Sequence, residues 1–146
     1  MGAEFLTSWH SWLLLADALM AGIIMAVQWV VYPAFQYFSR EALNRWHAVY
    51  TRHITALVAP LMIAQLLGGL YWSTTHPGLF PFLYILLICV LWGITFLFFV
   101  PLHRQISRGM ATTADFRQLV RLNGVRTLLW LIVLAVHLIA HTTPVA

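Results

Sequence analysis

The pattern of apolar and polar positions divides the chain into four long apolar stretches separated by short polar segments. A helix needs about 20 mostly apolar residues to cross a bilayer. Each stretch meets that length, and we expect membrane spans at about 9–35, 54–72, 80–102 and 119–140. Because these spans leave little chain for anything else, the sequence predicts a single four-span domain over residues 1–146.

The polar segment between the first two spans has an amphipathic pattern of its own. Leu43, Trp46, Val49 and Tyr50 recur at helical spacing. We therefore expect a short amphipathic helix at the cytoplasmic membrane surface between spans one and two. A tight turn at 75–78 contains Pro and Gly, so spans two and three should form an antiparallel hairpin. The predicted fold is an all-α, integral membrane, up-down four-helix bundle.

Composition supports a membrane protein, since 62% of the residues are hydrophobic and 8% are charged. The chain has eight arginines and no lysine, and seven of the arginines lie between spans one and two or between spans three and four. They are Arg40, Arg45, Arg52, Arg104, Arg108, Arg117 and Arg121. The positive-inside rule then places both termini outside and both basic segments in the cytoplasm, as expected for a bacterial inner membrane.

The net charge of +4 is explained by this topology and by contact with anionic lipids. No nucleic-acid recognition motif accompanies the arginines, so nucleic acid is not expected as a partner. Gly-rich phosphate loops, nucleophile elbows, Cys-x-x-Cys and paired carboxylates are also missing from the sequence. Soluble-type hydrolase, nucleotide-binding and zinc-finger chemistries therefore have no support.

Three spans carry polar residues at helical spacing. Charged and unsatisfied polar groups are costly in hydrocarbon, so these faces should point into the bundle. In span one the face comprises His10, Asp17, Ala21, Gln28 and Tyr32; in span four it comprises Asn123, Arg126, Trp130, His137 and His141. In span two we expect His53, Pro60, Ala64, Gly68 and Tyr71 to face inward.

The first polar cluster is expected near the outer face, where His10 and Asp17 of span one meet His137 and His141 of span four. Histidines four residues apart share a helix face, so His10, His137 and His141 are candidate metal ligands, or axial ligands of a haem. The alternative is that these histidines are hydrated residues near the ends of spans. Asp17 lies deeper and needs a partner, for which a histidine is the candidate.

The second cluster is expected near the inner face, where Arg126 and Asn123 approach His53 and His103. Arg126 is a candidate anchor for an anionic or quinone-like head group, with His53 or His103 as proton donor or acceptor. Alternatively, Arg126 bonds Asn123, the Gln28 amide or the Tyr32 hydroxyl in a packing network. His47 and His76 are expected to be solvated.

Motifs at three span ends resemble the anthrone oxygenase-like family of small four-span membrane proteins. They are Val30-Val31-Tyr32-Pro33, Val100-Pro101-Leu102-His103 and Leu122-Asn123-Gly124-Val125-Arg126-Thr127 with Trp130. The resemblance covers nearly the whole chain, although Pro-Leu-His stands here where family members commonly have Pro-Leu-Asn. It implies a four-span fold and the oxidation of a polycyclic aromatic molecule.

A second resemblance is to the four-span, haem-binding protoporphyrinogen oxidases. His10 precedes Met20-Ala21-Gly22 much as a histidine precedes a Met-Ala-Gly segment in those proteins, and Arg121-Leu122-Asn123 is similar to their entry into span four. Their second haem ligand is a lysine, which this chain lacks. The resemblance therefore implies haem only if another residue, such as His137 or His141, supplies that ligand.

Two functions follow as hypotheses. The first is a membrane oxidoreductase that binds a flat lipophilic aromatic, a quinone, or a haem b or transition-metal cofactor within the bundle, or that works without a cofactor. The second is a non-catalytic accessory or assembly subunit of a larger membrane complex. The candidate partners are the bilayer, a lipophilic small molecule, a larger complex and a second copy of the chain.

Overall fold

The computed structural model describes residues 8–142, and in that range the chain is helical with no strand. Four helical segments are long and apolar enough to cross a membrane: Trp9–Tyr37, Arg40–Thr75, Leu79–Ser107 and Thr113–Thr142. The predictions of an all-α fold and of four spans are confirmed. Each observed segment extends beyond the span predicted for it, because polar turns continue the helices past the apolar stretches.

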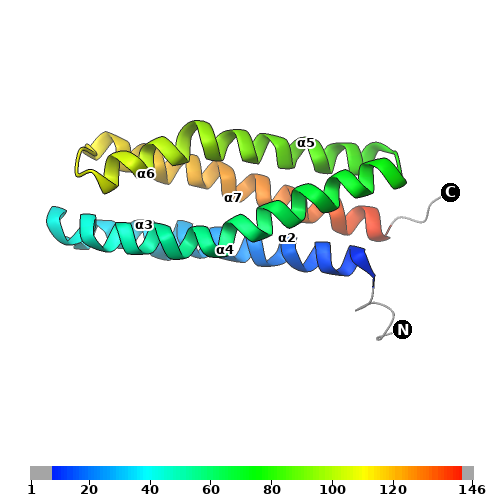
Figure 1. Ribbon diagram of the computed structural model, residues 1–146, viewed down its shortest axis with the longest axis horizontal. Helices are drawn as coiled ribbons and strands as arrows, with labels where there is room; N and C mark the ends of the chain where they lie inside the picture. Colours follow the sequence, from blue (N-terminus) through cyan, green and yellow to red (C-terminus); the bar gives the residue numbers. More distant parts are fainter. Residues whose placement is uncertain (1–7, 143–146) are drawn as a thin grey trace.

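Each long segment is built from one or more helices, labelled as in Figure 1. The first contains α2 (Trp9–Ala26), η1 (Val27–Val31), α3 (Tyr32–Ala34) and η2 (Phe35–Tyr37). The second is α4 (Arg40–Thr75) alone. The third contains α5 (Leu79–Ile94), η3 (Thr95–Phe99) and α6 (Val100–Ser107), and the fourth is α7 (Thr113–Thr142).

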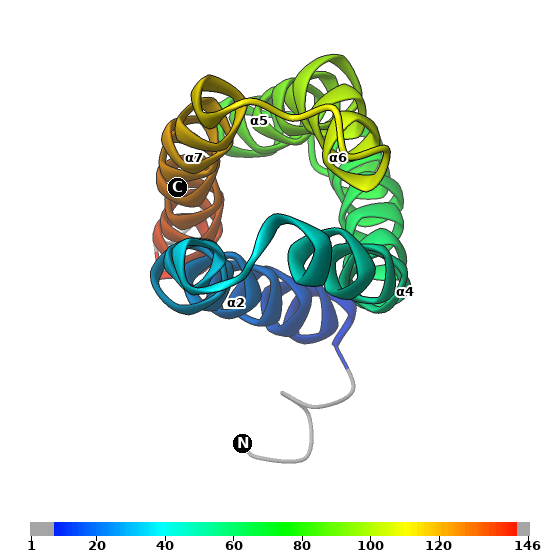
Figure 2. The same cartoon turned by 90° about the vertical axis from the view of Figure 1, so that its left-hand side faces the viewer.

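The four segments run up and down in sequence order and enclose a shared interior (Figures 1 and 2). Helix α2 packs against α4 and α7, and α5 packs against the same two helices, so α2 and α5 lie diagonally opposite (Figure 2). The start of α2, the end of α7 and the α4–α5 turn share one end of the bundle, called here the terminal end (Figure 1). The opposite end, where α6 joins α7, is called the arginine end.

The segment at 39–52 is not a separate amphipathic helix. It forms the first turns of α4, a continuous helix of 36 residues that begins after Ser39, whose side chain accepts a hydrogen bond from the Ala42 backbone N–H. At 1.5 Å per residue such a helix is about 54 Å long, well beyond the roughly 30 Å of a bilayer core. The amphipathic turns therefore extend span two, because no helix breaker separates them from it.

Two prolines are each preceded by a π-helical turn. The η1 turn ends at Val31, two residues before Pro33, and the η3 turn ends at Phe99, two residues before Pro101. Proline has no N–H and its ring clashes with the carbonyl four residues earlier, so the helix accommodates it with a wider turn. Both helices continue beyond the proline, and both wide turns lie in the half of the bundle nearer the arginine end.

The core of the terminal half depends on a close approach between α4 and α5. A Cβ atom added at Gly69 would lie 2.8 Å from Cε1 of the buried Tyr84 ring. Glycine is therefore required there for packing. At Gly22 on α2, a Cβ atom would meet no other atom within 4 Å.

We expect Gly69→Ala to lower the free energy of unfolding in detergent by about 1–3 kcal/mol, because the Tyr84 ring must move. Gly22→Ala is the matched control and should be neutral or stabilising by up to about 1 kcal/mol, since alanine favours helix. Denaturant unfolding followed by circular dichroism measures both. Equal stability of the two variants would contradict this account of the α4–α5 contact.

Candidate functional site

The polar faces of spans one and four point inward, as predicted. On α2 the buried members are Asp17 and Ala21, followed by Tyr32 on α3. On α7 they are Asn123, Arg126, Trp130 and His137. His141, at the end of α7, is exposed.

The face predicted for span two is wrong for four of its five residues. The exception is Gly68, which is partly buried and where a Cβ atom would lie 2.8 Å from the Leu13 side chain of α2, so its expected close approach to another helix is confirmed. His53, Pro60, Ala64 and Tyr71 are exposed. The inward face of α4 instead comprises Val58, Met62, Gln65, Gly69 and Trp72. The predicted face was the side of the helix that carries His53 and Tyr71. These two residues lie near the ends of the span, where exposure of a polar side chain costs little free energy.

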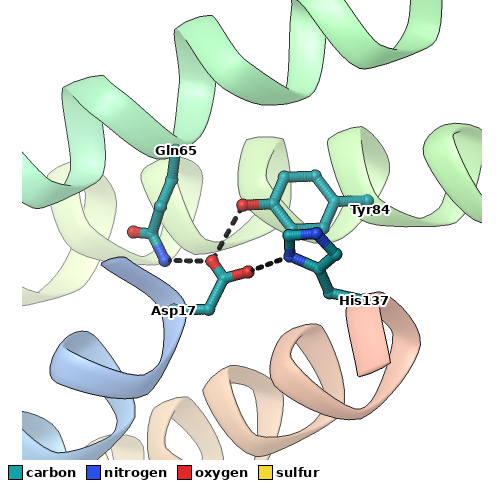
Figure 3. A network of polar contacts seen from close by, with 4 residues as sticks. All are labelled: Asp17, Gln65, Tyr84 and His137. Carbon is teal, nitrogen blue, oxygen red and sulfur yellow. Dashed lines mark hydrogen bonds and ion pairs between the residues drawn. The ribbon is translucent and has the colours of Figure 1, made fainter. Parts of the chain in front are cut away.

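Asp17 is the centre of a buried network near the terminal end (Figure 3). Its Oδ1 accepts hydrogen bonds from Gln65 Nε2 at 2.7 Å and from the Tyr84 hydroxyl at 2.8 Å. Its Oδ2 accepts from His137 Nδ1 at 2.7 Å. The four side chains come from α2, α4, α5 and α7, so this carboxylate connects all four long segments.

The structure confirms the expected pairing of Asp17 with a histidine and adds two partners that the sequence reasoning missed. Gln65 was detectable as a polar side chain in the middle of an apolar stretch. Tyr84 gave no such signal, because a tyrosine in a span is equally typical of an apolar core or of the membrane interface.

His10 and His137 lie close together at the terminal end. Their ring centres are 5.8 Å apart, and the ring centres of His10 and His141 are 6.2 Å apart. Within residues 8–142, however, no group of three or more His, Cys, Asp or Glu side chains is placed to hold a metal ion. The three histidines therefore do not form a shared three-ligand site in this structure.

A haem does not fit between these histidines. The Trp72 ring centre lies 5.5 Å from that of His10 and 5.1 Å from that of His137. Trp9 stacks on His10 with ring centres 3.5 Å apart, and Tyr84 contacts His137. Aromatic side chains thus fill the volume that a porphyrin ligated by both histidines would need.

Arg126, nearer the arginine end, is buried without a strong partner. Its side chain extends from α7 toward α4, where Nη2 contacts the Met62 sulfur at 3.9 Å, and its guanidinium carbon lies 4.9 Å from the centre of the Phe99 ring. Its Nε is buried and has no hydrogen-bond partner in the described part of the chain. The ion pairs among residues 8–142 are Arg45–Glu41 and His137–Asp17, so no carboxylate there neutralises Arg126.

The packing network that was the alternative explanation for Arg126 is not present. Asn123 Nδ2 donates to Gln28 Oε1 at 2.8 Å, so these two amides satisfy each other. No hydrogen bond joins Arg126 to either amide or to the Tyr32 hydroxyl in the described structure. The guanidinium is therefore available to a ligand.

Arg126 lines a cavity of about 480 Å³ between α4 and the α5–η3–α6 segment. Most of the lining is apolar and aromatic. The polar groups in it include Tyr50, Thr51, Thr95 and His103; the apolar walls include Val27, Ile54, Val58, Met62, Trp92, Phe96, Phe99 and Val100. Thr55 and Phe96 are exposed, so the cavity opens at the side of the bundle. It also extends to the arginine end, where the exposed Arg104, Ser107 and Arg108 belong to its lining.

A chain of hydrogen bonds through His47 connects two residues of the cavity lining, His103 and Ser107. His103 lines the cavity, and its Nδ1 lies 2.9 Å from Nε2 of His47. His47 Nδ1 lies 3.2 Å from the hydroxyl of Ser107, which is exposed at the end of α6. His47 is fully buried, so the expectation that it is solvated is wrong; the exposed His76 agrees with that expectation.

Two of the predicted inner-cluster residues do not line the cavity. His53 is exposed, and its Nδ1 is bonded to the Val49 carbonyl of the same helix. Asn123 is committed to Gln28 on the α2–α7 side. The structure therefore brings together Arg126 and His103, with His47 behind His103.

Comparison of the chain with protein-family models, with curated proteins and with solved structures finds no match.

The Asp17 network gives a direct prediction. Tyr84→Phe removes one of the donors to Asp17 without changing the packed ring, and should lower the free energy of unfolding by about 1–2 kcal/mol. Tyr37→Phe is the control, because the Tyr37 side chain is 83% exposed. Thermal unfolding in detergent compares the two variants. If Tyr84→Phe were as stable as the control, the Tyr84 hydroxyl would not contribute to the stability of the Asp17 network.

Proposed function

We propose that this protein is a membrane oxidoreductase that binds a flat lipophilic aromatic molecule carrying a phenolic, quinone or carboxylate oxygen. The observation that carries the proposal is the buried, unpaired Arg126 at the cavity wall. Its guanidinium keeps its charge, and a cation at membrane depth costs at least about 2.5–3.5 kcal/mol. An oxygen ligand in the cavity that accepts from the guanidinium would offset that cost.

The cavity supports an aromatic ligand. Ligand pockets are typically about 300–1,000 Å³, mostly apolar, with a few polar groups that orient the ligand. A volume of about 480 Å³ suits a fused-ring molecule, with Phe99 and Trp92 as flat walls and Arg126 as the polar anchor. Entry from the side of the bundle suits a molecule that partitions into lipid.

His103 is the proposed proton acceptor for the bound molecule. With Nδ1 directed to His47, His103 keeps Nε2 for a phenolic O–H in the cavity. Transfer of that proton breaks the O–H bond and leaves a phenolate beside Arg126, while the Nδ1 proton of His103 passes to Nε2 of His47. The Nδ1 proton of His47 passes to the exposed Ser107 hydroxyl, which releases its own proton to water. The electron-rich phenolate is then the form oxidised, with dioxygen or a membrane electron acceptor taking the electrons.

The resemblance to the anthrone oxygenase-like family supports the same reaction class. Residues of all three resembling motifs, Tyr32, Val100, His103 and Arg126, line the cavity. Both π-helical turns lie beside it, and such turns occur frequently at functional sites. We accordingly propose membership of that family, with a cofactor-free oxidation of a lipophilic phenol as the reaction.

The proposed location is a bacterial inner membrane with the arginine end in the cytoplasm and both termini outside. A Cys89→Ser background allows single cysteines to test this. Thr75→Cys, in the exposed last turn of α4, should react with an impermeant maleimide in intact cells, whereas Met110→Cys, exposed between α6 and α7, should react only after permeabilisation. The reverse labelling pattern would overturn the orientation.

Binding is tested with a lipophilic 2-hydroxy-1,4-naphthoquinone, a flat coloured acid whose absorbance reports its ionisation. Wild type should bind the anion, and Arg126→Gln should weaken binding roughly ten- to hundredfold, as expected for a lost charged hydrogen bond of about 1.5–3 kcal/mol. Arg121→Gln is the control, since Arg121 is exposed and does not line this cavity.

Equal affinity of wild type and Arg126→Gln would reject the anchor role. A folded wild-type protein that binds neither the naphthoquinone nor its reduced form would favour the alternative, a non-catalytic subunit of a larger membrane complex. Co-purification of that complex with wild type would then identify it.

A further inference from the structure

Two imidazole nitrogens at the terminal end are buried and have no hydrogen-bond partner within residues 8–142. They are Nδ1 of His10 and Nε2 of His137. This group is separate from the cavity of Arg126, since neither histidine lines it. Because a buried polar atom without a partner costs free energy, the two nitrogens need an explanation.

The Asp17 carboxylate determines which nitrogen of His137 carries the proton. A carboxylate only accepts hydrogen bonds, so the Nδ1 that lies 2.7 Å from Asp17 must be the donor. In a neutral imidazole the other nitrogen, Nε2, then presents its lone pair. A carboxylate behind a histidine in this way is the usual support of a metal-binding imidazole.

The separation of the two rings matches that of two imidazoles on opposite sides of one ion. A metal–nitrogen distance of about 2.0 Å places each ring centre roughly 3 Å from the ion, and a linear pair of rings about 6 Å apart. The ring centres of His10 and His137 are 5.8 Å apart. That ring separation is the one expected for one ion with two imidazole ligands.

Charge selects a monovalent ion. Asp17 is the carboxylate at this end of the described bundle, and one negative charge balances one positive charge; a divalent ion would leave an excess charge in an apolar interior. Imidazole nitrogens suit copper, and zinc requires four ligands. We propose that His10 and His137 bind one Cu(I) ion, with Asp17 orienting His137.

The surroundings fit an entry route from the aqueous side. The exposed His76 and His141 have ring centres 6.3 Å and 6.2 Å from that of His10, so two exposed imidazoles lie next to the site. Trp9, stacked on His10, and Trp72, in contact with both rings, shield the site from lipid. Because the two nitrogens are buried, an ion bound by them must give up its water.

The test is an anaerobic titration of the detergent-purified full chain with Cu(I), in competition with a chromophoric Cu(I) chelator, and with Ag(I) as a non-redox probe. Wild type should bind one ion per chain. His10→Ala and His137→Ala should each lower the affinity at least a hundredfold, and Asp17→Asn about 10- to 100-fold, as for other outer-shell partners. His76→Ala and His141→Ala are the controls and should change it less than threefold.

X-ray absorption of the copper-loaded protein should show two nitrogen ligands and no sulfur ligand. If His137→Ala does not fold, His10→Ala decides, because His10 lies outside the Asp17 network. The proposal is overturned if wild type takes up no Cu(I) or if His10→Ala binds Cu(I) as tightly as wild type. It is also overturned if the His76→Ala and His141→Ala controls lose the ion as fully as His10→Ala does, because that result would indicate a surface histidine site. Naphthoquinone binding through Arg126 should be unaffected by His10→Ala, so the two proposals fail separately.

Discussion

One buried carboxylate determines how the four spans meet. A charge in hydrocarbon must be paired, and Asp17 is paired by donors from each of the other three long segments. Each bond fixes the rotation and the height of one helix relative to α2. Apolar packing alone tolerates small slips along a helix axis, whereas hydrogen bonds of 2.7–2.8 Å do not. The fold of the terminal half is therefore specified by this network together with the close Gly69–Tyr84 contact that it requires.

In the half of the bundle nearer the arginine end, the buried charge is not paired in this way. Asp17 has three donors, but Arg126 has a thioether contact and an aromatic face, with its Nε unsatisfied. The wide turns before Pro33 and Pro101 lie beside this arginine, so the backbone there is the least regular in the spans. A saturated charge indicates a structural role, and an unsaturated charge beside a cavity indicates a binding role. This contrast, rather than either residue alone, distinguishes the two halves.

How much was predictable from the sequence depended on how many polar residues each helix carries. Spans one and four each have several polar residues on one face, so their inward sides were predicted correctly, and with them Asp17, Arg126 and His137. Span two has a single deep polar residue, Gln65, and more conspicuous polar residues near its ends, so its face was misassigned. Burial of His47 was not predictable either, because it depends on α4 continuing unbroken past Arg52 and on His103 meeting it from a segment 56 residues away.

The two polar regions are separated along the bundle axis. Arg126 and His137 lie eleven positions apart on α7, or about 16 Å along the helix axis. The side chains between these depths are apolar or aromatic and fully buried, including Met20, Ile88, Leu91, Trp130 and Val133. Asp17 therefore cannot neutralise Arg126, although the two carry opposite charges in one small domain. An apolar layer that keeps them apart leaves the arginine without a carboxylate counter-ion in the described part of the chain, at the wall of a cavity.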